Sequence, residues 1–328
     1  MKHVLDRRQW LLGLAAGAAT LTTPAAHAQR AAGGYPSGPL TLVVPYTAGG
    51  QFDTLARVVG KAMAADLGQN VVVENVAGAG GNIAASRVAR ARPDGLTLLL
   101  CGGNFALARS LFRKLDFDPL EDFAPISMVS VAPHVIMASV ASGITSFAQM
   151  QQQARGGKLS YGSPGVGTSM HLTLEMVKDR LGLDVLHVPY KGGSNVMTDL
   201  VGGQIDLGII AVGPALEFIR SGKVRALAVT SRQRSAQLPQ VPSVSELGLS
   251  DFDAGSWSGL AVPRQTPPEV VARLNASVRA ALNTLEVKRL FEEQSFLAIP
   301  DTPAQMLQFL RLEAQRLGPV IQRLNLAQ

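Results

Sequence analysis

Short apolar runs alternate with longer amphipathic stretches along most of the chain. Apolar runs of this length are typical of buried strands, and apolar residues recurring every three or four positions indicate helices. The pattern predicts strands beginning at Leu40 and at 71–75, 96–100, 159–162, 184–190, 205–210 and 224–230. It predicts helices continuing from Thr54 and at 84–90, 170–181, 196–202, 214–220, 268–282, 286–293 and 302–324. This alternation favours an α/β fold, with a sheet covered by helices on both faces.

Two segments are expected to cross between two domains. One is the extended stretch 126–139, which Pro133 interrupts, and the other is the tryptophan-containing stretch 256–263. About 300 residues follow position 28 (328 minus 28), which suits two cores better than one. We expect a first lobe of 35–129 plus 259–328 and a second lobe of 130–258.

The first residues are typical of an export signal. Lys2, Arg7 and Arg8 precede an apolar stretch at 10–21, and a small-x-small cleavage site ends at Ala28. The apolar stretch is shorter than the roughly 20 residues that span a membrane. The paired arginines resemble a twin-arginine signal, although Sec export stays open. We expect residues 1–28 to be removed and the remaining chain to be soluble.

Charge argues against one class of function, and cysteine content indicates how the fold is stabilised. The formal charge is +6, and removal of the signal leaves about +4 (6 minus 2), with basic residues dispersed and without aromatic interleaving. Nucleic-acid binding is therefore not expected. Cys101 is the only cysteine, so stability must come from core burial, and its apolar neighbours predict a buried thiol.

Catalytic and metal motifs are also missing from the sequence. Ser169 and His171 stand two positions apart at a predicted helix start, where side chains diverge, and no Gly-x-Ser-x-Gly elbow occurs. His134, His171 and His187 are scattered, without a His-Glu-x-x-His motif or a cysteine pair. The glycine-rich run 78–84 lacks the acidic partner of a dinucleotide site. We expect no enzyme, no metal and no cofactor.

Three loops between a strand and a helix could hold an anion. They span 45–53, 160–171 and 188–195, and all are rich in glycine. The first turn of a helix has about four N–H groups without intrahelical partners, and its dipole adds partial positive charge. Each loop also has a simpler interpretation, since glycines turn chains, hydroxyls cap helices and Lys191 suits a solvated loop tip. Two such loops in different lobes favour the binding interpretation.

Eight motifs in order resemble the substrate-binding receptors of the tripartite tricarboxylate transporter family, also called Bordetella uptake gene (Bug) receptors. They are Tyr35-Pro-Ser-x-Pro, Val43-Val-Pro-Tyr-x-x-Gly-Gly-x-x-Asp53, Val72-Val-Glu-Asn-x-x-Gly-Ala-Gly-Gly-Asn82, Pro93-Asp-Gly95, Asp118-Pro-x-x-Asp-Phe-Ala-Pro125, Gly165-x-Gly-Thr-x-x-His171, His187-Val-Pro-Tyr-Lys-Gly192 and Leu238-Pro-x-Val-Pro242. The match covers essentially all of the chain after the signal.

The resemblance implies a periplasmic solute-binding protein of type II-like fold, in which two α/β lobes joined by two crossing segments close on a small carboxylate. It implies delivery to the membrane subunits of a tripartite transporter, by a protein expected to be a monomer. An alternative is a ligand sensor that signals through a sensor kinase. The candidate ligand-binding residues are Tyr46, Thr47, Ala48, Gly49, Gly50, Phe52, Asp53, Asn104, Ser163, Gly165, Gly167, Thr168, Ser169, His171, Tyr190, Lys191, Gly192 and Ile210.

The chain departs from the family pattern at two places. Ile210-Ala211 occupies positions where many members carry Asp-Asn, and a receptor that grips an amino group would want that aspartate. The stretch after Leu100 is Cys-Gly-Gly-Asn-Phe, where Thr-His or Thr-Asn is common. With Phe52 in the first loop, these residues predict an aromatic or otherwise partly apolar carboxylate as ligand.

Overall fold

The computed structural model describes residues 34–327, so the expected export signal at 1–28 lies outside the described residues. Residues Gly38–Gln328 form one compact unit, distinct from Met1–Ser37. None of the helices described at 34–327 is both long enough and apolar enough to cross a membrane.

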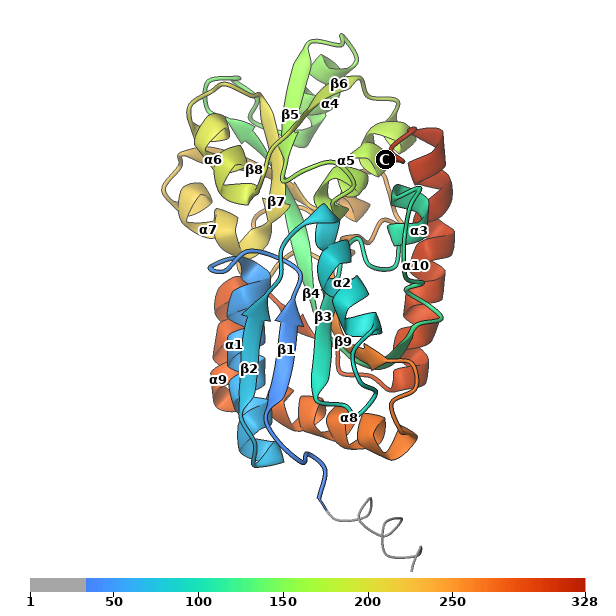
Figure 1. The fold of residues 1–328 in the computed structure, drawn as a ribbon. Coiled ribbons are helices and arrows are strands. Elements are labelled where there is room, and N and C mark those ends of the chain that lie inside the picture. Colours follow the sequence, from blue (N-terminus) through green and yellow to red (C-terminus); the bar gives the residue numbers. More distant parts are fainter. Residues whose placement is uncertain (1–33, 328) are drawn as a thin grey trace, which may run out of the picture. The chain divides into compact units, whose positions relative to one another are not determined.

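The first group of strands follows the order β2, β1, β3, β9 (Figure 1). The strands β1 (Leu40–Val44), β2 (Val71–Asn75) and β3 (Thr97–Gly102) are parallel, and β9 (Gly255–Pro263) runs antiparallel to β3. The short β10 (Leu297–Ala298) pairs with β4 (Phe123–Ser139). Helix connections between the parallel strands cover both faces, as strand order β2-β1-β3 requires. We call this group and its helices the first lobe.

Strand β4 belongs to both groups of strands. Its first part pairs with β9 as far as Pro133, opposite Gly255, and from His134 it pairs with β7 (Leu207–Ala211). Beyond β7 lie β5 (Leu159–Ser163) and β6 (Val185–Pro189), both parallel, while β8 (Val224–Val229) pairs with β4. We call the group β5 to β8 with its helices the second lobe. One continuous strand therefore joins the two lobes.

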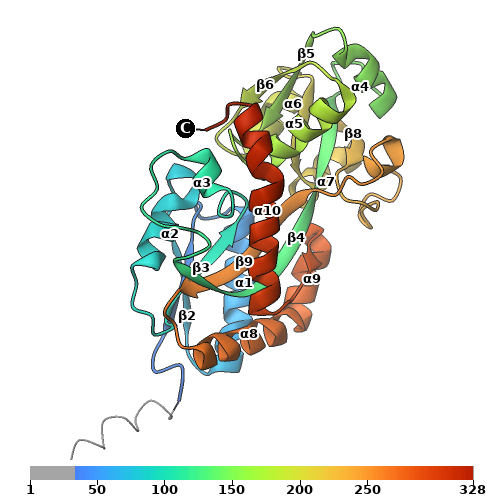
Figure 2. The ribbon, with the colours of Figure 1, turned by 90° about the vertical axis from the view of Figure 1, so that its right-hand side faces the viewer.

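Helices cover both faces of the first lobe (Figure 2). Helix α1 packs on β1 and β2 and also contacts α8 and α9. Helix α2 packs on β1, β3 and β9. In the second lobe α5, α6 and α7 all contact β7, and α10 runs from β4 to α5 (Figure 2). Their bounds are α1 (Gln51–Leu67), α2 (Asn82–Ala89), α3 (Ala108–Leu111), α4 (Phe147–Ala154), α5 (Ser169–Leu181), α6 (Gly193–Val201), α7 (Val212–Arg220), α8 (Pro268–Leu282), α9 (Leu285–Gln294) and α10 (Pro303–Arg323), with short 3₁₀ turns at η2 (Ala79–Gly81) and η3 (Ser245–Leu247).

Most side chains of the interior are aliphatic and form separate clusters. One cluster packs Val43, Leu99 and Met306 within the first lobe, and another packs Val135, Met197 and Leu200 within the second. Cys101 is free and buried in the first cluster, as predicted, and its burial raises the pKa of the thiol to about 12. The thiol donates to the Gly259 carbonyl at 3.3 Å, so it acts as a small core residue.

The sequence predictions for the strands and long helices are confirmed within a few residues. Helices α3 and α4 and the turns η2 and η3 were not predicted. The expected crossing stretch 126–139 lies within β4, whereas 256–263 lies in β9, which pairs with β3 and β4 of the first lobe. The fold has the predicted class, two α/β lobes joined by crossing segments. The residue boundaries 35–129 plus 259–328 and 130–258 stay a prediction.

A methyl group at Gly255 should disturb the junction of the lobes. A Cβ built there would lie 2.6 Å from the carbonyl oxygen of Ala132, a backbone atom that cannot rotate away. We expect Gly255→Ala to lower the free energy of unfolding by about 1–3 kcal/mol, measured by urea denaturation. Gly38→Ala, where no atom lies within 4 Å, is the matched control and should change it by less than about 1 kcal/mol. Equal stability of both variants would contradict this account of the junction.

Candidate functional site

A cleft of about 1160 Å³ opens between the loops of the two lobes. The loop between β1 and α1 lines it on the first lobe, and the starts of α5, α6 and α7 line it on the second. The structure brings most of the predicted site residues together here: Tyr46, Thr47, Ala48, Gly49, Gly50, Phe52, Asn104, Gly165, Thr168, Ser169, Lys191, Gly192 and Ile210. The two loops expected to face each other thus line one cleft.

Four helices begin at the cleft. The residue that precedes each helix lines the cleft, namely Gly50 before α1, Thr168 before α5, Gly192 before α6 and Ala211 before α7. Thr168 accepts a hydrogen bond from the His171 N–H, but the other three positions have no side-chain cap. A glycine or alanine has no side-chain oxygen to offer the free N–H groups of the first turn. These helix starts therefore leave donors and partial positive charge at the cleft.

The charge of the cleft has one sign. Among the described residues that line it, Lys191 is the only one with a full charge, and none is acidic. Lys191 is exposed, so its ammonium group can move toward a bound molecule. Together with the helix starts, this arrangement suits an anion and disfavours a cation.

Asp53 does not line the cleft, although the sequence placed it among the site residues. Its buried carboxylate accepts the Gly49 N–H at 2.9 Å and forms an ion pair with Arg57, also at 2.9 Å. The hydrogen bond from Arg57 holds the pKa of Asp53 below its usual range. Asn75 adds a second hold on this loop by donating to the Tyr46 carbonyl at 3.1 Å. Asp53 therefore shapes the first loop from behind.

Ser163, Gly167 and His171 belong to the second loop but likewise do not line the cleft. His171 Nδ1 accepts the Gly167 N–H at 3.0 Å, and Ser163 Oγ lies 2.8 Å from His187 Nε2. The two imidazole rings stack with centroids 3.9 Å apart. Burial lowers the pKa of both histidines, that of His187 to about 4, so both are neutral at pH 7. A neutral His171 is what the bond from Gly167 needs, because a protonated Nδ1 could not accept it.

Tyr190 is the fifth predicted site residue outside the cleft lining. Its hydroxyl donates to Asp199 at 2.7 Å, and burial raises its pKa to about 12. The bond ties the start of the third loop to α6. Lys191 and Gly192, the next two residues, do line the cleft, so the third loop presents its tip rather than its tyrosine.

Part of the cleft lining is apolar. Met197, Ile210 and Phe218 line it from the second lobe, and Phe52 lines it from the first. The rings of Phe52 and Tyr46 contact each other with centroids 4.7 Å apart. An elongated ligand could place an anionic end on the helix starts and an apolar body against these side chains.

Several cleft residues were not predicted from the sequence. They are Gln51, Gly80, Gly103, Pro164, Val166, Met170, Gly193, Ser194, Asn195, Met197, Thr198, Val201, Ala211, Pro214, Phe218 and Ser256. Gln51, Pro164, Val166 and Met170 lie inside the predicted loops 45–53 and 160–171, so naming every residue of those loops would have included them. Ser256 lies in a strand, and the pattern of the sequence carries no signal that would place it here.

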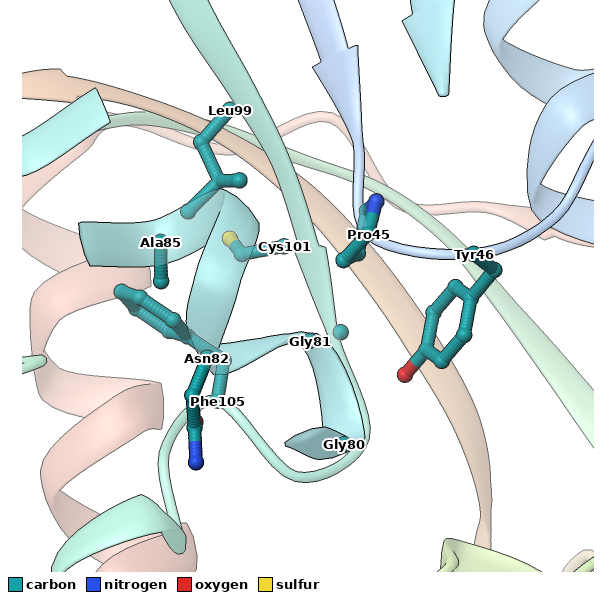
Figure 3. A pocket seen from close by; sticks show the side chains of 10 residues that line it. Pro45, Tyr46, Gly80, Gly81, Asn82, Ala85, Leu99, Cys101 and Phe105 are labelled. Carbon is teal, nitrogen blue, oxygen red and sulfur yellow. The ribbon is translucent and has the colours of Figure 1, made fainter. Parts of the chain in front are cut away.

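A second, smaller cavity lies behind the first loop (Figure 3). Pro45, Tyr46, Gly81, Cys101 and Phe105 are among its lining residues, and its volume is about 10 Å³. A space of this size holds about one water molecule. It is too small for an organic ligand, so the large cleft is the candidate site.

Comparison with known proteins finds relatives over most of the chain. A profile described as "Tripartite tricarboxylate transporter family receptor" matches residues 55–326. The protein BugT of Bordetella pertussis is 36% identical over 291 residues, which cover 88% of this chain and 89% of BugT.

Solved structures with the same fold include two with bound ligands. Rpa4515 of R. palustris, solved with adipate, is 31% identical with a TM-score of 0.81, and the match covers 88% of this chain and 97% of that one. MatC of Rhodopseudomonas palustris, solved with bound malate, is 32% identical with a TM-score of 0.78, and the match covers 88% and 100%. Both ligands are dicarboxylates.

Asp53 offers a graded test of the support behind the first loop. Asp53→Ala removes both the acceptor for Gly49 and the partner of Arg57, and we expect it to lower the free energy of unfolding by about 1–3 kcal/mol. Asp53→Asn keeps an acceptor oxygen and should lower it less. Urea denaturation at pH 7 measures both. If Asp53→Ala is as stable as the wild type, Asp53 does not support the loop.

The neutral histidines predict how stability depends on pH. The folded-state pKa of His187 is about 4, below its usual value near 6.5, so only the unfolded chain binds this proton between those values. This residue should therefore reduce the free energy of unfolding as the pH falls from about 6.5 to 4, with no further loss below. We expect His187→Gln to flatten that part of the curve of unfolding free energy against pH. Parallel curves for variant and wild type would count against the assignment.

Proposed function

The chain belongs to the tripartite tricarboxylate transporter receptor family, whose members are periplasmic solute-binding receptors rather than enzymes, and we propose that it captures a small carboxylate and delivers it to a membrane transporter of that type. The observation that carries the choice of ligand is the meeting of four helix starts at one cleft, three of them without a side-chain cap. Unpaired N–H groups and helix dipoles attract a carboxylate without requiring a bound cation.

The number of donors is sufficient for useful affinity. A hydrogen bond to a charged group contributes about 1.5–3 kcal/mol, and a micromolar dissociation constant needs only about 8 kcal/mol net. A few such bonds, with Lys191 nearby, can supply this after the costs of association. The scarcity of charged side chains in the cleft is therefore compatible with tight binding.

The size and the two walls of the cleft support lobe closure. A volume of about 1160 Å³ exceeds the 300–1000 Å³ of typical ligand pockets. A small carboxylate on the start of α1 would leave most of this space empty, whereas approach of the second lobe adds the starts of α5, α6 and α7. Ligand binds both walls only in the closed state and therefore shifts the equilibrium toward it.

The lining favours a carboxylate with an apolar part. Ile210, Met197 and Phe218 offer no hydrogen bond to a second polar group, and no acidic side chain among the described lining residues awaits an amino group. Adipate, which Rpa4515 binds, has an apolar middle of four methylene groups. Malate, bound by MatC, is shorter and more polar. We propose that the ligand is a linear or aromatic carboxylic acid with an apolar part, as adipate has, rather than an amino acid.

We further propose that the protein acts in the periplasm as a monomer, after cleavage near Ala28. The basic, apolar and small-residue segments of 1–28 support export by the twin-arginine or Sec route. The membrane subunits of a tripartite transporter are the proposed partner. Uptake of the identified ligand by cells carrying those subunits, with and without this chain, tests delivery.

A ligand screen tests the proposed function directly. Thermal-shift measurements with succinate, malate, adipate, benzoate and several amino acids should show stabilisation by at least one carboxylate, by about 3 kcal/mol at 100-fold excess over its dissociation constant. Adipate and benzoate should stabilise more than the amino acids. No stabilisation by any carboxylate would refute carboxylate capture.

A side chain placed at a helix start should weaken binding strongly while preserving the fold. Gly50 has φ −83° and only the Thr47 oxygen within 4 Å of an added Cβ, so Gly50→Val fits the backbone and places its side chain at the start of α1. Gly192 has φ 165°, which is extended backbone, and offers the same test at α6. We expect each valine to weaken binding of the best carboxylate by at least 10-fold in calorimetry.

The thermal midpoint of each variant without ligand provides the control. It should stay within a few degrees of the wild type, since the nearest atom to an added Cβ is 3.5 Å away at Gly50 and 3.9 Å away at Gly192. Normal affinity in a stable Gly50→Val variant would show that the ligand does not use the start of α1.

A further inference from the structure

Three side chains link the crossing strands to the cleft. His134 on β4 is buried, and its Nε2 atom lies 2.9 Å from the hydroxyl of Ser256 on β9. The Ser256 hydroxyl lies 3.0 Å from that of Ser169, the first residue of α5. Ser256 and Ser169 both line the cleft, whereas His134 lies behind them. The result is a hydrogen-bonded chain from the junction of the lobes to the candidate ligand site.

The surroundings of His134 determine where its proton sits. Burial lowers its pKa to about 3, so the ring is neutral and carries one N–H. The Nδ1 atom is buried and has no hydrogen-bond partner. An orphaned buried N–H is rarer than an orphaned acceptor, which assigns the proton to Nε2. His134 therefore donates to Ser256.

This donation sets the direction of the whole chain. The Ser256 oxygen accepts from His134, so its own proton is free for the Ser169 oxygen at 3.0 Å or the Met170 sulfur at 3.8 Å. The hydroxyl oxygen is nearer and is the stronger acceptor, so Ser256 donates to Ser169. Within the described residues, the Ser169 hydroxyl then finds only the Met170 sulfur as an acceptor, at 3.5 Å. A thioether is a weak acceptor, so a carboxylate oxygen would displace it.

We propose that His134 orients Ser256 and Ser169 so that Ser169 presents its hydroxyl proton to the ligand carboxylate, beside the strands that join the lobes. The inference rests on the proposed capture of a carboxylate. Ser169 and Ser256 are then ligand-site residues, and His134 is a positioning residue. Aligned hydroxyls polarise one another, so the last donor is stronger than an isolated serine. If the Ser169 oxygen instead faced the ligand with only its lone pairs, it would repel the carboxylate.

The test compares variants by calorimetry with the carboxylate of the panel above that binds the wild type best. Ser169→Ala and Ser256→Ala should each weaken binding about 10-fold, and the double variant should be no more than about 20-fold weaker, because both changes break one chain. His134→Met, which has no donor, should weaken binding by a similar factor. His134→Gln, whose amide can donate from a comparable distance, should restore most of the affinity.

A matched control lies on the same two strands. Ser130 and Ser258 form a buried hydroxyl pair at 2.7 Å and do not line the cleft, so Ser258→Ala should leave affinity unchanged. If the Ser169→Ala and Ser256→Ala variants fold and keep normal affinity, the hydrogen-bonded chain is wrong while the proposed function stands. The same holds if the losses of affinity in the two single variants multiply in the double variant. Equal losses in His134→Met and His134→Gln would overturn its direction. If no carboxylate binds the wild type, both proposals fall.

Discussion

Backbone N–H groups at the starts of helices are the constraint on which the cleft depends. Each helix must begin somewhere, and its first turn has donors that the helix itself cannot satisfy. In this chain the N-cap positions of three helices are Gly50, Gly192 and Ala211, where a serine or aspartate side chain would accept hydrogen bonds from those donors. The donors are left to water or to a guest, and a carboxylate has both the charge and the lone pairs to replace that water.

The rest of the structure keeps these helix starts in place without adding charge to the cleft. Asp53 turns its carboxylate toward Arg57 and the loop backbone, and the stacked His171 and His187 are held neutral by burial. A carboxylate facing the cleft would repel an anion, and a charged histidine could not accept the bond from Gly167. Anion binding by backbone N–H groups therefore requires other residues, such as Asp53 and His171, to fix the position of the loop backbone.

The sequence predicted the elements better than it predicted their contacts. Strand and helix periodicity located the loop of Gly50, but it could not show that the Asp53 carboxylate turns back onto that loop. Helix α4 was missed although Ser146 caps it and Phe147, Met150 and Ala154 are buried on one face, because its glutamines dilute the apolar pattern. Ser256 was missed for another reason: its role depends on His134 and Ser169, which are far away in sequence.

The junction of the lobes explains why a strand residue can belong to the site. Strand β4 changes partners between Pro133 and His134, from β9 to β7, and proline contributes no N–H to either ladder. His134 is thus the first residue of β4 in the second lobe, and Ser256 stands on the strand opposite. In the closure proposed above, rotation of one lobe against the other acts close to these residues. A ligand held beside them would lie near the hinge of the proposed closure, so its contacts there could form before closure and persist through it.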